Sequence, residues 1–316
     1  FDDIYQLWFD SYKLTVKEST WATTKRIFND HILPIFANKK ISSIDTAFCQ
    51  KTVNSWFKHP YAQYKRFFNY ASKIFDYSVK LEIISSNPTK AVIVPQARHQ
   101  KIEKRDMKKE FDTKNELQHF LNCVYDFDNY QAYAFFRLLA FTGMRKGEAL
   151  ALSWNDIDFK SRKMKINKTQ SNGNGRLVVQ TTKTENSDRE IYIDSKTLSI
   201  LHHWRQEQRI KLFAFGFNTD IPSQLVFASR KNEMHNPGKP RVWLEQVCKR
   251  YNLKPITIHG FRHTYATLAI EGGMQPKQLQ TQLGHSDIKT TLDIYTSVTK
   301  DQKQDTARQF VKFVNF

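Results

Sequence analysis

Large apolar side chains recur at helical spacing over the N-terminal part of the chain. Two stretches show this spacing clearly: Ile4, Leu7, Trp8 and Tyr12, and later Tyr64, Phe67, Phe68 and Phe75. Residues three and four positions apart share one face of a helix, so each stretch predicts an amphipathic helix. We therefore expect residues 1–86 to form a helical domain whose core is largely aromatic.

This periodicity ends at Asn87-Pro88, a dipeptide that disfavours a continuing helix. Residues 87–111 carry no apolar repeat, and their stretch RHQKIEKRDMKK holds six Lys or Arg against two acids. Such a charge run is typical of a solvated linker. We expect a basic linker between two folded domains, which can also follow a polyanionic backbone.

Residues 112–300 have the pattern of one mixed domain. A helix is predicted near Leu117, and Ala134–Phe141 is predicted to be a buried helix that ends at Thr142-Gly143. Alternating segments then predict two hairpins, IDFKSRKMKI and LVVQTTKTENSDREIYI, before helices resume near Lys196. The expected fold class is mostly α with a small antiparallel sheet (α+β).

The net charge indicates what kind of partner the protein binds. The 316 residues include 49 Lys and Arg against 31 Asp and Glu, a formal charge of +18. Such an excess on a folded protein favours a polyanionic partner, of which nucleic acid is the commonest. A protein that is basic without such a partner is the alternative.

Composition argues against several other classes. Cys49, Cys123 and Cys248 lie far apart and none belongs to a C-x-x-C pair, so neither a disulfide framework nor a cysteine zinc site is indicated. The most apolar run, AYAFFRLLAFTG, carries Arg137 and is much shorter than a membrane span of ~20 residues. No signal peptide is recognised, and we expect a protein of the reducing cytoplasm. The chain starts at Phe1 without a methionine, which suggests a fragment.

Six polar residues lie where no structural pattern requires them: Arg145, Lys183, His259, Arg262, His285 and Tyr295. Two guanidinium groups can form paired hydrogen bonds with phosphate oxygens. Two imidazoles and an ammonium group can donate or transfer protons, and a tyrosine hydroxyl can act as a nucleophile. Together these residues predict a site that binds one phosphodiester and attacks it with a phenol.

Members of this set also have purely structural explanations. Arg145 can form an ordinary surface ion pair with Glu148, three residues further on. His285 follows a short helix that is expected to begin at Pro276 and end at Gly284, where a histidine can serve as a cap.

The nucleophile candidate has a structural alternative too. Ser286 is expected to cap the next helix, on which Ile288, Leu292 and Tyr295 form an apolar stripe typical of a core tyrosine. Lys183 lies where a strand meets a hairpin turn, and a lysine at such a place is ordinarily solvated.

The segment HGFRHT places two candidates on one helix, which Thr257 can cap. At about 100° per residue, His259 and Arg262 lie ~60° apart near the helix N-terminus, where the helix dipole favours an anion. His263 adds a histidine pair at i, i+4, but no H-E-x-x-H pattern accompanies it. We therefore expect His263 to be a structural hydrogen bonder and the site to hold no metal.

The order and spacing of these residues resemble those of the tyrosine recombinases, also called the phage integrase family. TGMRKGEALALSW is similar to the family's first arginine box, TKTENSDREIYI to its lysine hairpin, and HGFRHTYATLAIEGG and LGHSDIKTTLDIYT to its second and third boxes. The segment STWATTKRIFNDHILPIF resembles the family's DNA core-binding domain. The resemblance implies a helical core-binding domain and a mixed catalytic domain that close on double-stranded DNA as a C-shaped clamp.

The same resemblance implies a mechanism. Tyr295 would attack the phosphorus and leave a 3′-phosphotyrosyl link, Lys183 would protonate the leaving 5′ oxygen, and Glu148 would orient Arg145. No metal, ATP or other cofactor is expected. Strand exchange through a Holliday junction implies a homo-oligomer on DNA, from dimer to tetramer, and an accessory directionality factor is a further candidate partner. An integrase of a phage or transposon, acting on DNA in the bacterial cytoplasm at the nucleoid, is the favoured interpretation.

Four segments are expected: a core-binding domain (1–86), a linker (87–111), a catalytic domain (112–300) and a tail (301–316). The tail ends in an apolar FVKFVNF motif, which either folds back on its own domain or, as the resemblance implies, docks on a neighbouring protomer. Basic residues of the first two segments are candidates for contact with DNA phosphates: Lys25, Arg26, Lys65, Arg66, Lys73, Arg98, Lys101, Lys104 and Arg105. A DNA-binding protein without chemistry and an enzyme like the type IB topoisomerases are the alternative functions.

Overall fold

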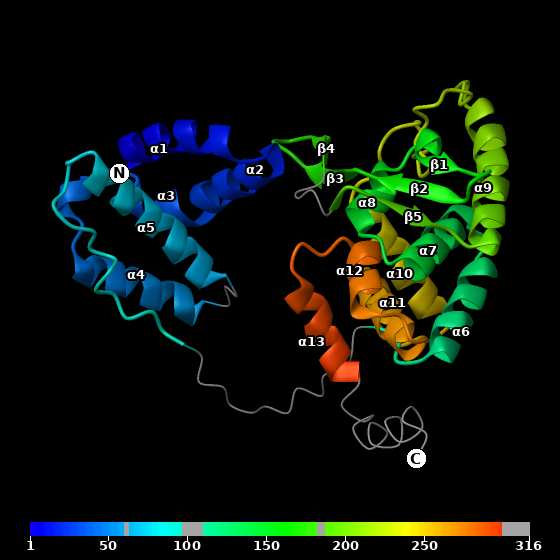
Figure 1. The fold of residues 1–316 in the computed structure, drawn as a ribbon. Coiled ribbons are helices and arrows are strands. Elements are labelled where there is room, and N and C mark those ends of the chain that lie inside the picture. Colours follow the sequence, from blue (N-terminus) through cyan, green and yellow to red (C-terminus); the bar gives the residue numbers. More distant parts are fainter. Residues whose placement is uncertain (60–62, 97–109, 182–186, 299–316) are drawn as a thin grey trace, which may run out of the picture. The chain divides into compact units, whose positions relative to one another are not determined.

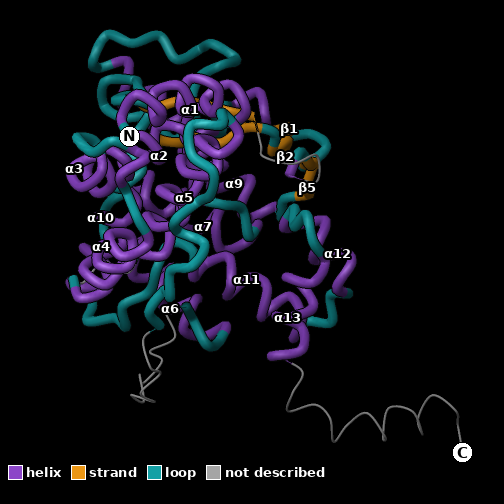
Figure 2. Tube along the Cα trace, turned by 90° about the vertical axis from the view of Figure 1, so that its left-hand side faces the viewer, coloured by secondary structure: helices purple, strands orange, loops and turns teal. Residues whose placement is uncertain are grey.

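The computed structural model describes residues 1–59, 63–96, 110–181 and 187–298. The chain divides into two compact units (Figure 1). The first holds the described residues up to 96 together with residues 172–176, and the second holds the remaining described residues from 110 onwards. Helices dominate both units, and the strands form a small part of the chain (Figure 2).

The first unit is helical, as the sequence predicts. Its elements are α1 (Asp2–Thr15), α2 (Glu18–Ile27), the π-helical turn η1 (Phe28–Ile32), α3 (Leu33–Phe36), the 3₁₀ turn η2 (Ile41–Ser43), α4 (Thr46–Lys58) and α5 (Tyr64–Lys80). Their shared core is rich in aromatic rings, and Phe28, Phe36 and Phe75 are fully buried in it. Burying such large apolar side chains is the main force that holds the helices together.

The first ten residues of the expected linker are attached to this helical unit. Asn87 donates from Nδ2 to Asp76 Oδ1 at 2.8 Å, and the Thr46 hydroxyl donates to the carbonyl of Pro88 at 3.0 Å. Gln50 exchanges two hydrogen bonds of 2.8 Å with the backbone of Ile93. The segment up to residue 96 therefore packs with the first unit, and residues 97–109 lie outside the described residues.

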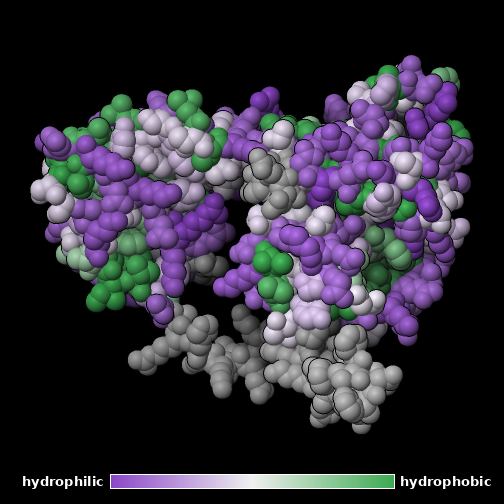
Figure 3. Space-filling model, viewed as in Figure 1, coloured by the Kyte–Doolittle hydropathy of each residue, from purple (hydrophilic) through white to green (hydrophobic). Residues whose placement is uncertain are grey.

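The second unit combines helices with two small sheets. Its helices are α6 (Lys114–Tyr125), α7 (Tyr130–Thr142), α8 (Lys146–Ala151), the 3₁₀ turn η3 (Trp154–Asp156), α9 (Ser195–Phe213), α10 (Lys239–Arg250), α11 (Gly260–Glu271), α12 (Pro276–Leu283) and α13 (Ile288–Val298). Its strands are β1 (Ile157–Asp158), β2 (Lys163–Ile166), β3 (Lys168–Asn172), β4 (Leu177–Thr181) and β5 (Arg189–Tyr192). Hydrophilic side chains cover most of the face of this unit seen in Figure 3.

The first predicted hairpin is confirmed, because β1 pairs antiparallel with β2. The second predicted hairpin is wrong. β5 pairs with β2 in the three-stranded sheet β1-β2-β5, whereas β4 joins β3 in a separate two-stranded sheet. Burial explains the outcome: β5 alternates buried and exposed positions and places Ile191 opposite Met164, whereas β4 has no fully buried position.

Helix α7 forms the centre of the second unit and ends where the sequence predicts. Gly143 caps it with a φ of 65°, in the left-handed region that favours glycine. A Cβ atom at this position would come within 2.7 Å of the side chains of Leu283 and Tyr265. A glycine is therefore required both for the turn and for the close approach of α11 and α12.

The core of the second unit offers a test of this packing. Phe136 on α7 is fully buried and stacks on Phe261 of α11, with ring centroids 5.3 Å apart. We expect Phe136→Ala to lower the free energy of unfolding of this unit by about 3–5 kcal/mol. Phe213→Ala, at a position that is 76% exposed on α9, should change it by less than about 0.5 kcal/mol. Urea unfolding followed by tryptophan fluorescence measures both, and equal effects would contradict the packing described.

Candidate active site

The first candidate arginine lies at the start of α8, two residues after the Gly143 turn. The backbone N–H of Arg145 donates to Glu148 Oε2 at 2.8 Å, and its Nη1 donates to Glu148 Oε1 at 2.9 Å. The Arg145 side chain is 40% exposed, whereas that of Glu148 is only 2% exposed. Glu148 thus holds one side of a guanidinium group whose side chain remains partly exposed to solvent. The surface ion pair considered from the sequence is wrong in one respect, because its acid is buried.

A third residue, which is not among the six candidates, completes this ion pair. Arg189 on β5 donates from Nη2 to Glu148 Oε2 at 3.0 Å, from Nη1 to Oε1 at 3.4 Å and from Nε to the carbonyl of Gln282 at 2.8 Å. Burial alone would raise the pKa of Glu148, but Arg189 and Arg145 outweigh it and hold this pKa below its ordinary value. The sequence did contain a signal: Arg189 occupies the buried phase of a strand that continues with Ile191.

The second candidate arginine lies in the first turn of α11, where the Thr257 hydroxyl accepts from the N–H of Gly260 as the sequence predicts. Arg262 is 5% exposed and donates from Nη1 to the carbonyl of Gly143 and from Nη2 to that of Leu283. Burial and the neighbouring Arg145 lower the pKa of Arg262 to about 9. This value still leaves the guanidinium charged at neutral pH.

His285 follows α12, which begins at Pro276 and ends at the left-handed Gly284, as predicted. The side chain is almost fully buried, and its Nδ1 lies 2.9 Å from the hydroxyl of Thr291. Burial, followed by the charges of the nearby arginines, lowers the pKa of His285 to about 4. The imidazole is therefore neutral at pH 7 and can accept a proton.

His259 is the N-cap residue of α11 and is exposed, and its ring lies edge-on to that of His263 with centroids 4.7 Å apart. Desolvation of the ring, followed by the charges of His263 and the two arginines of the site, lowers the pKa of His259. Desolvation, assisted by the same positive surroundings, thus favours the neutral form of both candidate histidines. Among the residues that the structure describes, no three His, Cys, Asp or Glu side chains gather as a metal site.

Tyr295 lies on α13, which packs against α11 and α12 (Figure 1). Its ring is partly buried against a small apolar cluster that includes Ala266, Ile270 and Leu283. The structure thus gathers the arginines around Glu148 and the end of α12, which His285 directly follows, whereas Tyr295 contacts the adjoining apolar cluster.

Two expectations for α13 are wrong. The side chain of Asp287, and not of Ser286, accepts the N–H of Lys289 at the start of the helix. The apolar stripe is not buried either, because Ile288 and Leu292 are 38% and 42% exposed. The helix instead turns the fully buried Thr291 inward, toward His285.

Lys183 lies outside the described residues, within the segment 182–186. Two lysines on the described strands β2 and β3 have carboxylate partners. Lys163 pairs with Glu190 and Lys168 with Asp156, each at 2.7 Å.

The candidate DNA-binding residues of the first unit lie on two helices. Lys25 and Arg26 are on α2, and Lys65, Arg66 and Lys73 are on α5; all but the intermediate Lys25 are exposed. Arg66 and Lys73 both lie over the ring of Tyr70, with their charged ends 5.8 and 5.2 Å from its centroid. The other candidates, Arg98, Lys101, Lys104 and Arg105, lie outside the described residues.

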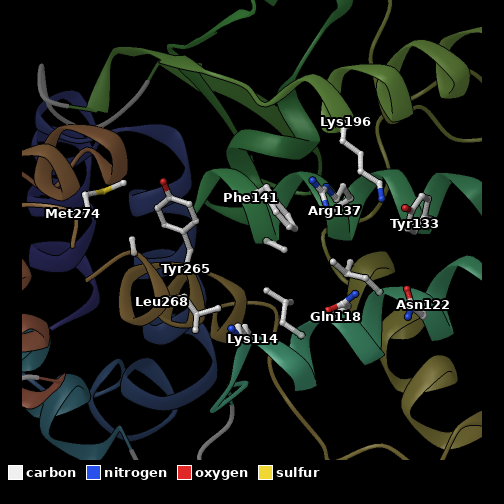
Figure 4. A pocket seen from close by; sticks show the side chains of 14 residues that line it. Lys114, Gln118, Asn122, Tyr133, Arg137, Phe141, Lys196, Tyr265, Leu268 and Met274 are labelled. Carbon is white, nitrogen blue, oxygen red and sulfur yellow. The ribbon is translucent and has the colours of Figure 1, made fainter. Parts of the chain in front are cut away.

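A pocket of about 540 Å³ opens elsewhere in the second unit, between α6, α7 and α11 (Figure 4). Tyr265, Leu268 and Phe141 contribute to its apolar lining, and none of the five candidates within the described residues lines it. None of the helices in the described ranges has the length and apolar character of a membrane span.

Comparisons with known proteins agree with this fold and site. Residues 110–302 match the phage integrase family, and residues 1–57 match the N-terminal SAM-like domain of phage integrases. The first match covers more than half of the chain, so the protein belongs to the phage integrase family. The sequence resemblance to this family is therefore confirmed.

Named relatives and solved structures extend the match over nearly the whole chain. The chain is 27% identical to the ICEBs1 integrase of Bacillus subtilis, over 97% of this chain and 81% of that protein. It is 26% identical to a tyrosine recombinase XerC-like protein of Caldanaerobacter subterraneus, over 95% and 80%.

Two solved structures share the fold. The Tn1549 transposon integrase in complex with transposon right end DNA has a TM-score of 0.74 at 19% identity, over 96% of this chain and 98% of that one. A lambda integrase dimer bound to a core site has a TM-score of 0.66 at 15% identity, over 93% and 95%. The expected fold class, mostly α with a small antiparallel sheet, is confirmed.

The buried neutral His285 predicts a pH dependence of stability. In the unfolded chain His285 is protonated near its ordinary pKa of 6.5, whereas in the folded chain its pKa is lowered to about 4. The free energy of unfolding should therefore fall as the pH is lowered between these values. In His285→Gln this fall should be shallower, by at most about 1.4 kcal/mol per pH unit. Urea unfolding across this range tests it, and an unchanged slope would show that the imidazole is not held neutral.

Proposed function

We propose that the protein is a site-specific DNA recombinase of a mobile element, which cuts and rejoins DNA through a 3′-phosphotyrosyl intermediate. Membership of the phage integrase family supports this function. The observation that carries it is the convergence of Arg145, Arg262 and a neutral His285 at the end of α12. Relatives named integrase, transposase and tyrosine recombinase are consistent with it.

The phosphate-binding step rests on the two candidate arginines. The partly exposed Arg145 and the guanidinium of Arg262 bind the non-bridging oxygens of one phosphodiester. Charge on these oxygens increases in the pentavalent transition state, so fixed positive groups stabilise this state more than the bound substrate. The carbonyls and the carboxylate that hold both arginines fix their geometry before DNA binds.

The chemical step is a transfer of the phosphoryl group to tyrosine. The Tyr295 oxygen forms a bond to phosphorus while the bond to the 5′ oxygen breaks. Lys183 gives a proton to the leaving oxygen, and a neutral imidazole, His259 or His285, takes the proton of the phenol. The phosphotyrosyl ester retains the energy of the original linkage, so rejoining requires no ATP.

DNA is the proposed partner, and the formal charge of +18 supports it. We propose that the helical unit contacts phosphates through α2 and α5 and that both units close on the duplex. Recombination between two sites requires a homo-oligomer on DNA, with an accessory factor to set direction. The tail 301–316, proposed to be exchanged between protomers, lies outside the described residues.

Replacing the proposed nucleophile should separate binding from chemistry. Tyr295→Phe removes one hydroxyl group, so we expect near-normal DNA affinity and no covalent adduct on a nicked duplex substrate. Denaturing gel electrophoresis detects the adduct, and Tyr265→Phe serves as the control that still forms it. A covalent adduct of Tyr295→Phe would show that another residue is the nucleophile. Wild-type protein that binds DNA without forming an adduct would favour a DNA-binding protein without chemistry.

The general acid can be tested with a modified leaving group. Lys183→Ala should cleave ordinary DNA about 10²–10⁴-fold more slowly. It should recover most of its rate on DNA with sulfur at the 5′ bridging position, because a thiolate leaves without a proton. Lys165→Ala is the matched control on an exposed neighbouring strand residue. Equal losses on oxygen and sulfur substrates would exclude Lys183 from this role.

A further inference from the structure

Arg189 is an internal residue that the proposed chemistry does not use. It begins β5 opposite Ile166 of β2, on the face of the sheet that buries Ile191. Its side chain is only 4% exposed. A charged group is seldom placed at such a position, because burial costs several kcal/mol unless partners satisfy it.

The donors of Arg189 are divided between two parts of the site. Both terminal nitrogens face the carboxylate of Glu148, at 3.0 and 3.4 Å, and one of them also reaches the carbonyl of Ser187. The Nε donates to the carbonyl of Gln282, in the last turn of α12. Arg189 thereby joins the sheet to α8, which carries Arg145, and to α12, which precedes His285.

Three arginines bind successive carbonyls at the C-terminal end of α12. The consecutive carbonyls of residues 282, 283 and 284 accept from Arg189, Arg262 and Arg145, at 2.8, 2.8 and 3.4 Å. Free carbonyls at a helix C-terminus carry partial negative charge, which favours cations there. A shift of one arginine would therefore move the carbonyls that hold the other two.

We infer that Arg189 is a positioning residue for DNA cleavage, an inference that rests on the function proposed above. It acts through Glu148 on Arg145 and through the end of α12 on His285, without touching DNA. Since Glu148 is shared by two guanidiniums, Arg189 fixes the carboxylate that holds the partly exposed side chain of Arg145.

Arg189 also sets the charge of the site. Three guanidiniums against the one carboxylate leave two positive charges, because both histidines are neutral. These two charges are available for a phosphodiester whose negative charge increases in the transition state. A lysine at residue 189 would keep the charge but could not bridge Glu148 in two places while also bonding to Gln282.

The test uses the full chain and a nicked duplex substrate on which the wild-type protein forms the covalent adduct. Arg189→Lys should lower the single-turnover rate of adduct formation about 10- to 100-fold at saturating DNA, while the dissociation constant for DNA stays within about 2-fold. Arg189→Gln should be at least as slow. If neither variant folds, or if either cleaves at the wild-type rate, the inference is wrong.

A double-variant cycle tests the route through Glu148. Glu148→Gln and Arg189→Lys together should lose clearly less activity than the product of the two single losses. If the loss of activity in the double variant equals the product of the two single losses, Arg189 does not act through Glu148 and the inference is overturned.

Arg137→Lys is the matched control. Arg137 is also a buried arginine of the second unit, and its bonds go to Asp194 at 3.0 Å and to the hydroxyl of Thr197 at 2.9 Å, neither of which belongs to the site. This variant should lose stability but retain the wild-type cleavage rate. A loss of rate equal to that of Arg189→Lys would mean that cleavage responds to any lost buried arginine, and the inference would fail. Absence of cleavage by the wild-type protein would instead refute the proposed function.

Discussion

The carboxylate of Glu148 is the constraint on which the arrangement of the site depends. It is almost fully buried, so it must be paired within the protein or protonated. Arg145 and Arg189 both pair with it and keep it ionised, and each comes from a different element. The position of α8 relative to β5 therefore follows from the need to satisfy one charge, and not from apolar packing alone.

The end of α12 extends this constraint to the rest of the site. Its last carbonyls would otherwise be unsatisfied, and guanidinium donors from α8, α11 and β5 satisfy them. Gly143 and Gly284, each in the left-handed conformation, end α7 and α12, and these sharp ends allow the chain to approach closely enough for the bonds to form. Polar groups that would be costly to leave unpaired thus hold the arginines that we propose to bind phosphate in a fixed geometry before any ligand is present.

Desolvation and the same positive charges together determine the protonation state of the imidazoles. Both effects keep His259 and His285 neutral, which suits them to accept a proton and not to bind phosphate by charge. In the proposed function the arginines therefore have two effects: they bind the phosphodiester, and they help to keep the neighbouring imidazoles unprotonated.

The sequence by itself determined the helical nature of both units, the ends of α7 and α12 and the family, because local periodicity, glycine caps and short motifs are encoded in neighbouring residues. It also identified Arg145, Arg262 and His285, which the structure brings together. The partner of β5, the inward turn of Thr291 and the role of Glu148 as a shared ion-pair partner were decided only by tertiary structure. These features depend on which distant residues compete to bury apolar surface and to satisfy a buried charge, and no local pattern records that competition. Arg189 combines both kinds of information. The sequence shows a charged residue at a strand position expected to be buried, but only the tertiary structure shows its partners Glu148 and Gln282, which are 41 and 93 residues away.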